Sequence, residues 1–210
     1  MKVARILYPV TVLGPGKRIV IWVAGCKRAC KGCANPELWD ATSEQEISVF
    51  NLLTAIENLT EKVGGAVDGI TISGGEPFEQ IEEMSLLIDG VQKICSDILV
   101  FTGYTKDELV RKEGAGEILN RIAVLVDGPY VEEKNVGEVL RGSDNQQIWY
   151  RDEKIRMQYE EYQKIHKGQH MVENFTVKDG VISVGIHKRD FKETLEMRLK
   201  EKQIVTTQRR

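Results

Sequence analysis

The sequence of 210 residues has no long hydrophobic run, and this limits what the protein can be. A membrane-spanning helix needs about 20 consecutive apolar residues, and no stretch approaches that length. The first residues, 1–9, lack the apolar core of a secretory signal peptide. The net charge is only -3, so no excess of basic residues indicates nucleic acid or an anionic membrane surface as a partner. We therefore expect a cytoplasmic protein that binds neither nucleic acid nor membrane.

Cysteine and histidine are also scarce, with four and three residues. Cys26, Cys30 and Cys33 nevertheless fall within eight residues, with the spacing C-x3-C-x2-C, while Cys95 stands alone. Clustered cysteines in a cytosolic chain more often bind metal than form a disulfide framework. No histidine lies near the cluster in the sequence, because all three follow residue 165. The pattern predicts a metal site made of thiolates.

Three thiolates on one short loop suit a [4Fe-4S] cluster without a fourth protein ligand. Such a cluster normally takes one cysteine per iron, so three cysteines leave one iron open to a small molecule. A zinc site completed by Cys95 is the alternative, although Cys95 falls on the apolar stripe of an expected helix over 79–95. We also expect Lys27, Arg28 and Lys31 to lower the pKa values of the neighbouring thiols.

Segments with strand and helix patterns alternate over the first two thirds of the chain. Strands are expected at 3–13, 18–24, 69–73, 97–101 and 122–126, and helices at 48–62, 79–95 and 105–120. This alternation predicts an α/β fold with a parallel sheet and helices packed against it. Ligands of such sheets bind at the carboxyl ends of the strands, where the cysteine cluster falls.

The last sixty residues have a different pattern. A charged helix is expected over 152–166, and a second over 189–203. Between them, two β-branched segments flank Lys178-Asp179-Gly180, which is typical of a hairpin turn. We therefore divide the chain into a core domain, 1–150, and a C-terminal extension, 151–210, made of helix, hairpin and helix.

Two motifs together give the chain a family resemblance. The C-x3-C-x2-C loop is followed, at the end of the next expected strand, by Gly74-Gly75-Glu76-Pro77, and this pair resembles the radical S-adenosylmethionine (SAM) enzymes. Several segments within 1–150 are similar to the activating enzymes of anaerobic ribonucleotide reductases: Gly32, Phe101-Thr102-Gly103-Tyr104, Leu125-Val126-Asp127-Gly128-Pro129-Tyr130 and Arg141-Gly142-Ser143-Asp144-Asn145-Gln146. Asn35 with Trp39-Asp40 is similar to activases of glycyl radical enzymes in general.

The resemblance implies a fold, two cofactors and a set of site residues. It implies a partial, open βα barrel of the radical SAM type, with the small C-terminal α+β extension added. Cys26, Cys30 and Cys33 would hold a [4Fe-4S] cluster, and no catalytic side chain beyond the cluster and the cofactor is implied. The residues implied to bind SAM are Asn35, Ser73, Gly74, Gly75, Glu76, Pro77, Thr102, Gly103 and Asp127.

The activity implied by the resemblance is that of a radical SAM oxidoreductase. An electron from flavodoxin or ferredoxin would cleave SAM to a 5′-deoxyadenosyl radical, which would take a hydrogen from a glycine of a partner enzyme similar to anaerobic ribonucleotide reductase. The partner would then carry a glycyl radical.

Other interpretations of the same residues stay open. The chain could be a radical SAM enzyme acting on a small molecule or peptide, for example similar to 7-carboxy-7-deazaguanine synthase, or a zinc-binding interaction module. Asp127-Gly128-Pro129 could be an ordinary turn instead of a ligand-binding segment, and Arg141 could form a surface ion pair.

Overall fold

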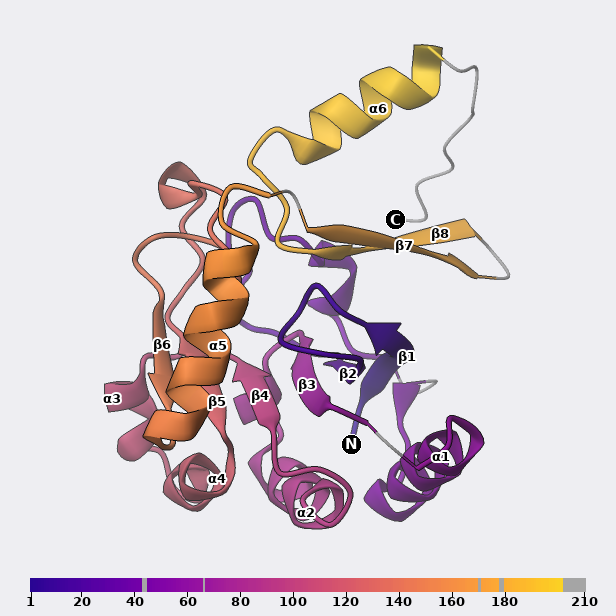
Figure 1. The fold of residues 1–210 in the computed structure, drawn as a ribbon, viewed down its shortest axis with the longest axis vertical. Coiled ribbons are helices and arrows are strands. Elements are labelled where there is room, and N and C mark those ends of the chain that lie inside the picture. The colour runs from indigo at the N-terminus through magenta and orange to yellow at the C-terminus, as the bar shows by residue number, and fades with distance from the viewer. Residues whose placement is uncertain (43–44, 66, 170, 178–179, 202–210) are drawn as a thin grey trace.

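The protein is built on a six-stranded mixed sheet. The computed structural model describes residues 1–42, 45–65, 67–169, 171–177 and 180–201 (Figure 1). The strands lie in the order β1-β2-β3-β4-β5-β6. Their bounds are β1 (Val3–Val10), β2 (Arg18–Val23), β3 (Gly69–Gly74), β4 (Ile98–Phe101), β5 (Val124–Asp127) and β6 (Gln147–Tyr150). The four central strands are parallel, as predicted, and β1 and β6 pair antiparallel at the two edges.

Helices cover the first face of the sheet (Figure 1). They are α1 (Val49–Lys62), α2 (Ile81–Val91), α3 (Lys106–Val110) and α4 (Ala115–Arg121). Alternate side chains of β2, Ile19 and Ile21, point to this face and are fully buried against helix residues such as Leu52 and Leu87. Each such side chain stabilises the fold by about 1.5–3 kcal/mol when it is buried. The fold is thus mixed α/β, and the open barrel stays a prediction.

Two predicted helices differ from the observed ones, and one observed strand was not predicted. The expected helix over 105–120 is two helices, because Gly114 takes a left-handed conformation (φ +77°) between α3 and α4. The expected helix over 79–95 ends at Val91, so Cys95 lies beyond it. Strand β6 was not predicted: its side chains alternate between exposed and half-buried, and β5 supplies the pairing partner.

Two elements after residue 150, a helix and a hairpin, pack on the second face of the sheet. Helix α5 (Glu153–Ile165) places Ile155, Tyr159 and Tyr162 against Leu99 of β4 and neighbouring strand residues. The hairpin of β7 (Val172–Val177) and β8 (Gly180–Gly185) places Val184 against the side of β2 that carries Trp22.

The expected hairpin and both helices of the extension are therefore present, and the predicted turn residues 178–179 lie outside the described residues. Helix α6 (Phe191–Glu201) follows and extends away from the sheet (Figure 1). The domain boundary at residue 150 stays a prediction. No helix in the described ranges is both long and apolar enough to cross a bilayer.

A buried arginine joins the amino-terminal ends of the strands to α5. Arg18, at the start of β2, is fully buried, and its guanidinium donates to the Asp97 carboxylate at 3.2 Å and to the Thr71 hydroxyl at 2.7 Å. The Tyr159 hydroxyl of α5 donates to the same carboxylate at 2.6 Å. Burying a charge costs free energy unless it is paired and hydrogen-bonded. Here both conditions hold, so this junction fixes α5 to the sheet.

Candidate metal centre

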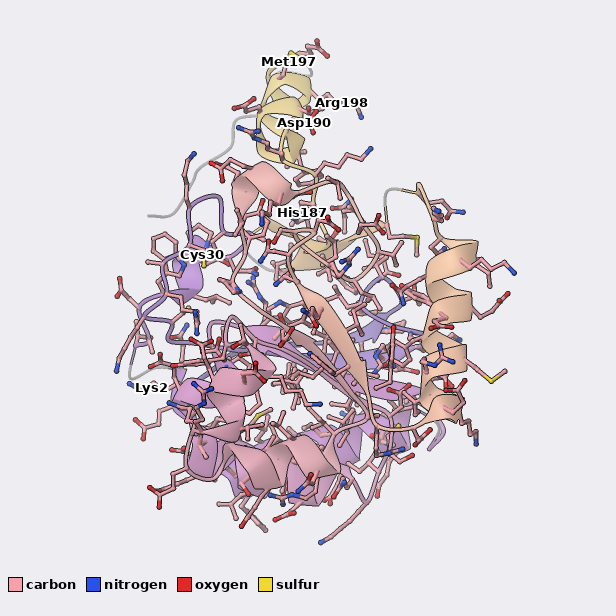
Figure 2. All side chains as sticks on the ribbon, turned by 90° about the vertical axis from the view of Figure 1, so that its left-hand side faces the viewer. Lys2, Cys30, His187, Asp190, Met197 and Arg198 are labelled. Atoms are coloured by element: carbon pink, nitrogen blue, oxygen red, sulfur yellow. The ribbon has the colours of Figure 1, made fainter. Side chains whose placement is uncertain are left out.

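The three clustered cysteines lie on a loop that begins where β2 ends. We call residues 25–40 the cysteine loop. Its two ends are joined by backbone hydrogen bonds, from the Gly25 N–H to the Leu38 carbonyl at 2.8 Å and from the Cys26 N–H to the Trp39 carbonyl at 3.0 Å. The short 3-10 helix η1 (Pro36–Leu38) provides the second of these ends. Cys30 lies at the rim of the molecule (Figure 2).

The backbone of the cysteine loop directs N–H groups at sulfur. The Asn35 N–H donates to Cys33 Sγ at 3.4 Å, and the N–H groups of Arg28 and Ala29 lie near the Cys26 thiol, where they favour its charged form. All three cysteines are partly exposed. Iron–sulfur clusters are held by thiolates whose sulfurs accept such hydrogen bonds. The donor set of this loop therefore fits the predicted cluster.

A site for a single metal ion fits less well. Within the described part of the chain, no three His, Cys, Asp or Glu side chains are grouped as the ligands of one ion. The ligands of a [4Fe-4S] cluster bind different iron atoms, so they need not converge on one point.

Cys95 lies at the other end of the sheet from the cysteine loop. It interacts electrostatically with Arg18 and Asp97, at the amino-terminal ends of β2 and β4. The cysteine loop follows the carboxyl end of β2, and six residues of strand span roughly 17 Å. A zinc site that joins Cys95 to the three clustered cysteines is therefore wrong.

The strand register brings residues 74–77, which we call the glycine-rich turn, against the cysteine loop. Strand β2 pairs with β3 so that Val23 lies opposite Gly74. The Gly75 N–H then donates to the Val23 carbonyl and the Glu76 N–H to the Gly25 carbonyl, both at 2.8 Å. A Cβ at Gly75 would overlap the Gly25 carbonyl oxygen. Two of the predicted site motifs are thus in backbone contact, which only glycine at position 75 permits.

We expect Gly75→Ala to displace the cysteine loop. Its Cβ meets backbone atoms that no side-chain rotation can move, so the iron bound per chain should fall severalfold and the thermal unfolding midpoint should drop. Gly116→Ala is the matched control, because a Cβ there meets no atom within 4 Å. This control removes a helical glycine and should be neutral or stabilising by up to about 1 kcal/mol. Equal iron contents in the two variants would contradict the prediction.

The Glu76 carboxylate ties the glycine-rich turn to the end of β4. It is almost fully buried and accepts hydrogen bonds from the Thr102 hydroxyl (2.7 Å), the Gly103 N–H (2.8 Å) and the Phe78 N–H (3.1 Å). Burial raises the pKa of this carboxyl, and the three hydrogen bonds oppose that shift. Glu76, Thr102 and Gly103 are therefore brought together in contacts that position the two turns, and their binding of SAM stays a prediction.

Pro77 begins a short 3-10 helix, η3 (Pro77–Glu79), and is buried. Ser73, half-buried at the end of β3, lies on the second face of the sheet, since the preceding Ile72 packs on the first.

Asp127 and Asn35 are bonded to protein groups. The buried Asp127 carboxylate accepts from the Lys106 N–H at 2.6 Å and from the Gln147 N–H at 3.2 Å. These bonds join the starts of α3 and β6, which favours a structural role for Asp127. The Asn35 side-chain oxygen accepts from Arg5 Nη2 at 3.1 Å, and Arg5 also pairs with Glu37 at 2.7 Å.

The basic residues of the cysteine loop are paired with carboxylates. Lys27 pairs with Glu79 at 3.5 Å, and Lys31 pairs with Glu132 at 2.9 Å and with Glu133. Burial raises the pKa of the Cys26 thiol, with smaller contributions from Glu76 and Cys33, and the N–H groups of Arg28 and Ala29 oppose it. The prediction that these cations lower the thiol pKa is therefore wrong for Cys26.

Two parts of the site could not be found from the sequence. Arg5 of β1 contacts the end of the cysteine loop, and Glu132 of the 3-10 helix η4 (Glu132–Lys134) contacts its middle. Both residues are ordinary charged residues in their local sequence, and only the packing of distant segments makes them neighbours of the cysteines. Gly103, by contrast, could be predicted, because it belongs to the segment Phe101-Thr102-Gly103-Tyr104 that resembles the activating enzymes.

Comparisons with known proteins agree with this geometry. A match to the family described as 4Fe-4S single cluster domain covers residues 12–149. Proteins named anaerobic ribonucleoside-triphosphate reductase-activating protein are 33% identical in Enterobacteria phage T4, over 68% of this chain and 90% of theirs, and 36% identical in Haemophilus influenzae, over 67% and 93%. The chain belongs to this family of activating proteins. The relative in Escherichia coli K12 is 33% identical over 67% of this chain and 94% of its own.

Membership of the activating-protein family covers only part of the chain. The family match ends at residue 149, and about a third of the chain lies outside the aligned part of each relative. The hairpin β7–β8 and helix α6 follow that match. They therefore lie outside the part of the chain that the family match covers.

A cavity of about 680 Å³ lies between η4 and the start of α6. Its lining includes Glu132, Asn135 and Lys188 but no residue of the cysteine loop or of the glycine-rich turn. It is therefore not the closed pocket beside the cysteines that an enzyme for small molecules would need.

Proposed function

We propose that this protein activates an anaerobic ribonucleotide reductase by installing a glycyl radical in it, using a [4Fe-4S] cluster and SAM. The observation that carries the proposal is the backbone contact between the cysteine loop and the glycine-rich turn, through Gly25 and Gly75, in a chain of the activating-protein family. Both motifs meet at the carboxyl ends of parallel strands, where ligands of such sheets bind.

Cys26, Cys30 and Cys33 would hold the cluster, and three ligands leave one iron open to SAM. When bound, the cluster and SAM supply the one-electron chemistry that removes a hydrogen atom from a glycine Cα of the partner. The protein would contribute by holding the cluster and SAM in position next to each other. Gly74 and Gly75 lack side chains, so the glycine-rich turn can lie against the backbone of Val23 and Gly25. This contact holds the turn beside the cysteine loop, where we propose that SAM binds.

We assign three roles among the remaining cofactor residues. The carboxylates of Glu76 and Asp127 are already hydrogen-bonded within the protein, so we assign them the task of fixing the turns at which SAM binds. Ser73 and the backbone of the glycine-rich turn, on the second face of the sheet, are then the groups proposed to meet SAM directly. Asn35, whose N–H faces the Cys33 sulfur, positions a ligand of the cluster.

The partial exposure of the three cysteines suits electron delivery from outside. We propose flavodoxin or ferredoxin as the electron donor and the cytoplasm as the compartment. We further propose that the six-stranded sheet, whose edge strands are β1 and β6, is a partial barrel that admits a glycine loop of the reductase.

The test is to mix the protein anaerobically with the reductase from the same organism, SAM and a reductant, and to record electron paramagnetic resonance. We expect a protein-centred radical on the reductase, with methionine and 5′-deoxyadenosine as the products of SAM. The matched sample without SAM should give no radical. Cleavage of SAM with no radical on the reductase would contradict the proposal and favour a small molecule or peptide as the substrate.

A further inference from the structure

We propose that Arg28 is a positioning residue of the iron–sulfur centre: its side chain fixes the turn that faces the Cys26 sulfur and raises the reduction potential of the cluster. The inference rests on the cluster alone and not on the identity of the activated enzyme. It concerns a residue between the first two cysteines, where the C-x3-C-x2-C spacing specifies no residue type.

The turn after Cys26 has an unusual backbone. The N–H groups of Arg28 and Ala29 lie near the Cys26 thiol and act to lower its pKa, and Ala29 has a positive φ of 44°. A non-glycine residue in this region is strained and persists only when its surroundings hold it. Some contact outside the turn must therefore keep the two N–H groups aimed at the sulfur.

The Arg28 side chain provides that contact. It crosses Gly103 at the end of β4, where any Cβ would overlap the arginine Cδ. Its guanidinium carbon lies 4.1 Å from the centre of the Tyr104 ring, and its side chain is 22% exposed. A guanidinium stacked on an aromatic face is held by cation–π attraction. The turn beside Cys26 is thus attached to the strand end that also carries Thr102.

The charge of Arg28 is placed between two carboxylates. Arg28 Nη2 lies 3.5 Å from Glu108 Oε2, and its Nε lies 4.0 Å from Glu76 Oε2. Nε is buried and makes no hydrogen bond to the described residues. Leaving a buried donor unbonded costs free energy, so hydrogen bonding alone does not account for an arginine here.

Both effects of Arg28 act on the cluster in one direction. A reduced cluster carries one more negative charge than an oxidised one, so N–H···S bonds and a nearby cation stabilise the reduced form. Glu76 opposes this effect when its carboxyl is ionised, because a negative charge near the cluster disfavours the reduced form. Lys27 and Lys31 contribute less, because their side chains are 89% and 76% exposed and water screens their charges.

The experiment compares Arg28→Gln with Lys27→Gln, a neighbouring position that loses the same charge without losing a buried contact. Each protein is reconstituted anaerobically, and its iron content and cluster midpoint potential are measured in a redox titration followed by electron paramagnetic resonance. We expect a clearly more negative midpoint in Arg28→Gln and an unchanged one in Lys27→Gln. Arg28→Lys keeps the charge and should recover part of the shift.

Equal midpoints in the parent protein and Arg28→Gln would overturn the proposal, as would equal shifts in the two glutamine variants. If Arg28→Gln binds no iron, the test is the midpoint potential of Tyr104→Leu. This variant removes the aromatic ring on which Arg28 stacks and keeps the arginine. We expect a smaller shift in the same direction, and an unchanged midpoint would overturn the proposal. None of these measurements involves the reductase, so they stand whether or not the proposed activation is observed.

Discussion

Replacing Cys30 with alanine is expected to abolish both cluster assembly and SAM cleavage. Cys30 is the middle one of the three proposed ligands, and its carbonyl accepts from the Cys33 N–H at 3.2 Å, so the substitution removes a proposed ligand and leaves the turn intact. Two thiolates on this loop cannot hold three irons of a cube that needs one ligand per iron. Iron per chain after anaerobic reconstitution should fall to background, and 5′-deoxyadenosine should be undetectable.

The matched control for this experiment is Cys95→Ala. Cys95 is half-buried and packs against the apolar cluster of the first face, at the end of the sheet opposite to the cysteine loop. We expect unchanged iron content in this variant and a modest loss of stability, since a small buried side chain is truncated. Retained SAM cleavage in Cys30→Ala, or lost iron in Cys95→Ala, would show that the ligands are misassigned.

Replacing Arg18 with leucine is expected to cause the largest loss of stability. The substitution leaves the Asp97 carboxylate without its cation at a site where the arginine is completely buried. Breaking a buried ion pair by removing one partner costs about 3–5 kcal/mol, because the remaining charge stays uncompensated. Chemical denaturation of the reconstituted protein, followed by circular dichroism, should show a much lower midpoint.

Two further variants test the reason for this loss. Arg156→Leu removes an arginine that pairs with Glu153 and Glu160 on the exposed side of α5, and it should change stability little. Adding Asp97→Asn to Arg18→Leu removes the uncompensated charge and should recover part of the loss. If Arg18→Leu is as stable as Arg156→Leu, the junction does not stabilise the fold.

The parallel sheet and the position of the site could be predicted because they depend on local patterns. Buried strands such as Gly69–Gly74 are short apolar runs, and each is followed by a helical period that requires a crossover to a parallel neighbour. The cysteine spacing and the glycine-rich turn are adjacent to strand ends in the sequence. Parallel pairing then places them together without further information.

The roles of individual polar groups could not be predicted, because they depend on partners far away in the chain. Glu76 bonds to Thr102 and Gly103, 26 and 27 residues away, and Arg18 bonds to Asp97, 79 residues away. A sequence pattern shows that a carboxylate follows a strand but not which donor its oxygens meet. The same limit explains why the backbone donors bonded to Asp127 could not be named in advance and why strand β6, which needs β5 as its partner, was missed.

The hairpin on the second face also limits how this protein can be shortened. Val10, Val20 and Trp22 are buried there together with Val184 of β8. A chain trimmed to the length of its relatives would expose these residues to water as a hydrophobic patch beside the site. Such a patch promotes aggregation. Engineering a minimal version therefore means redesigning that surface with polar residues before the last sixty residues are removed.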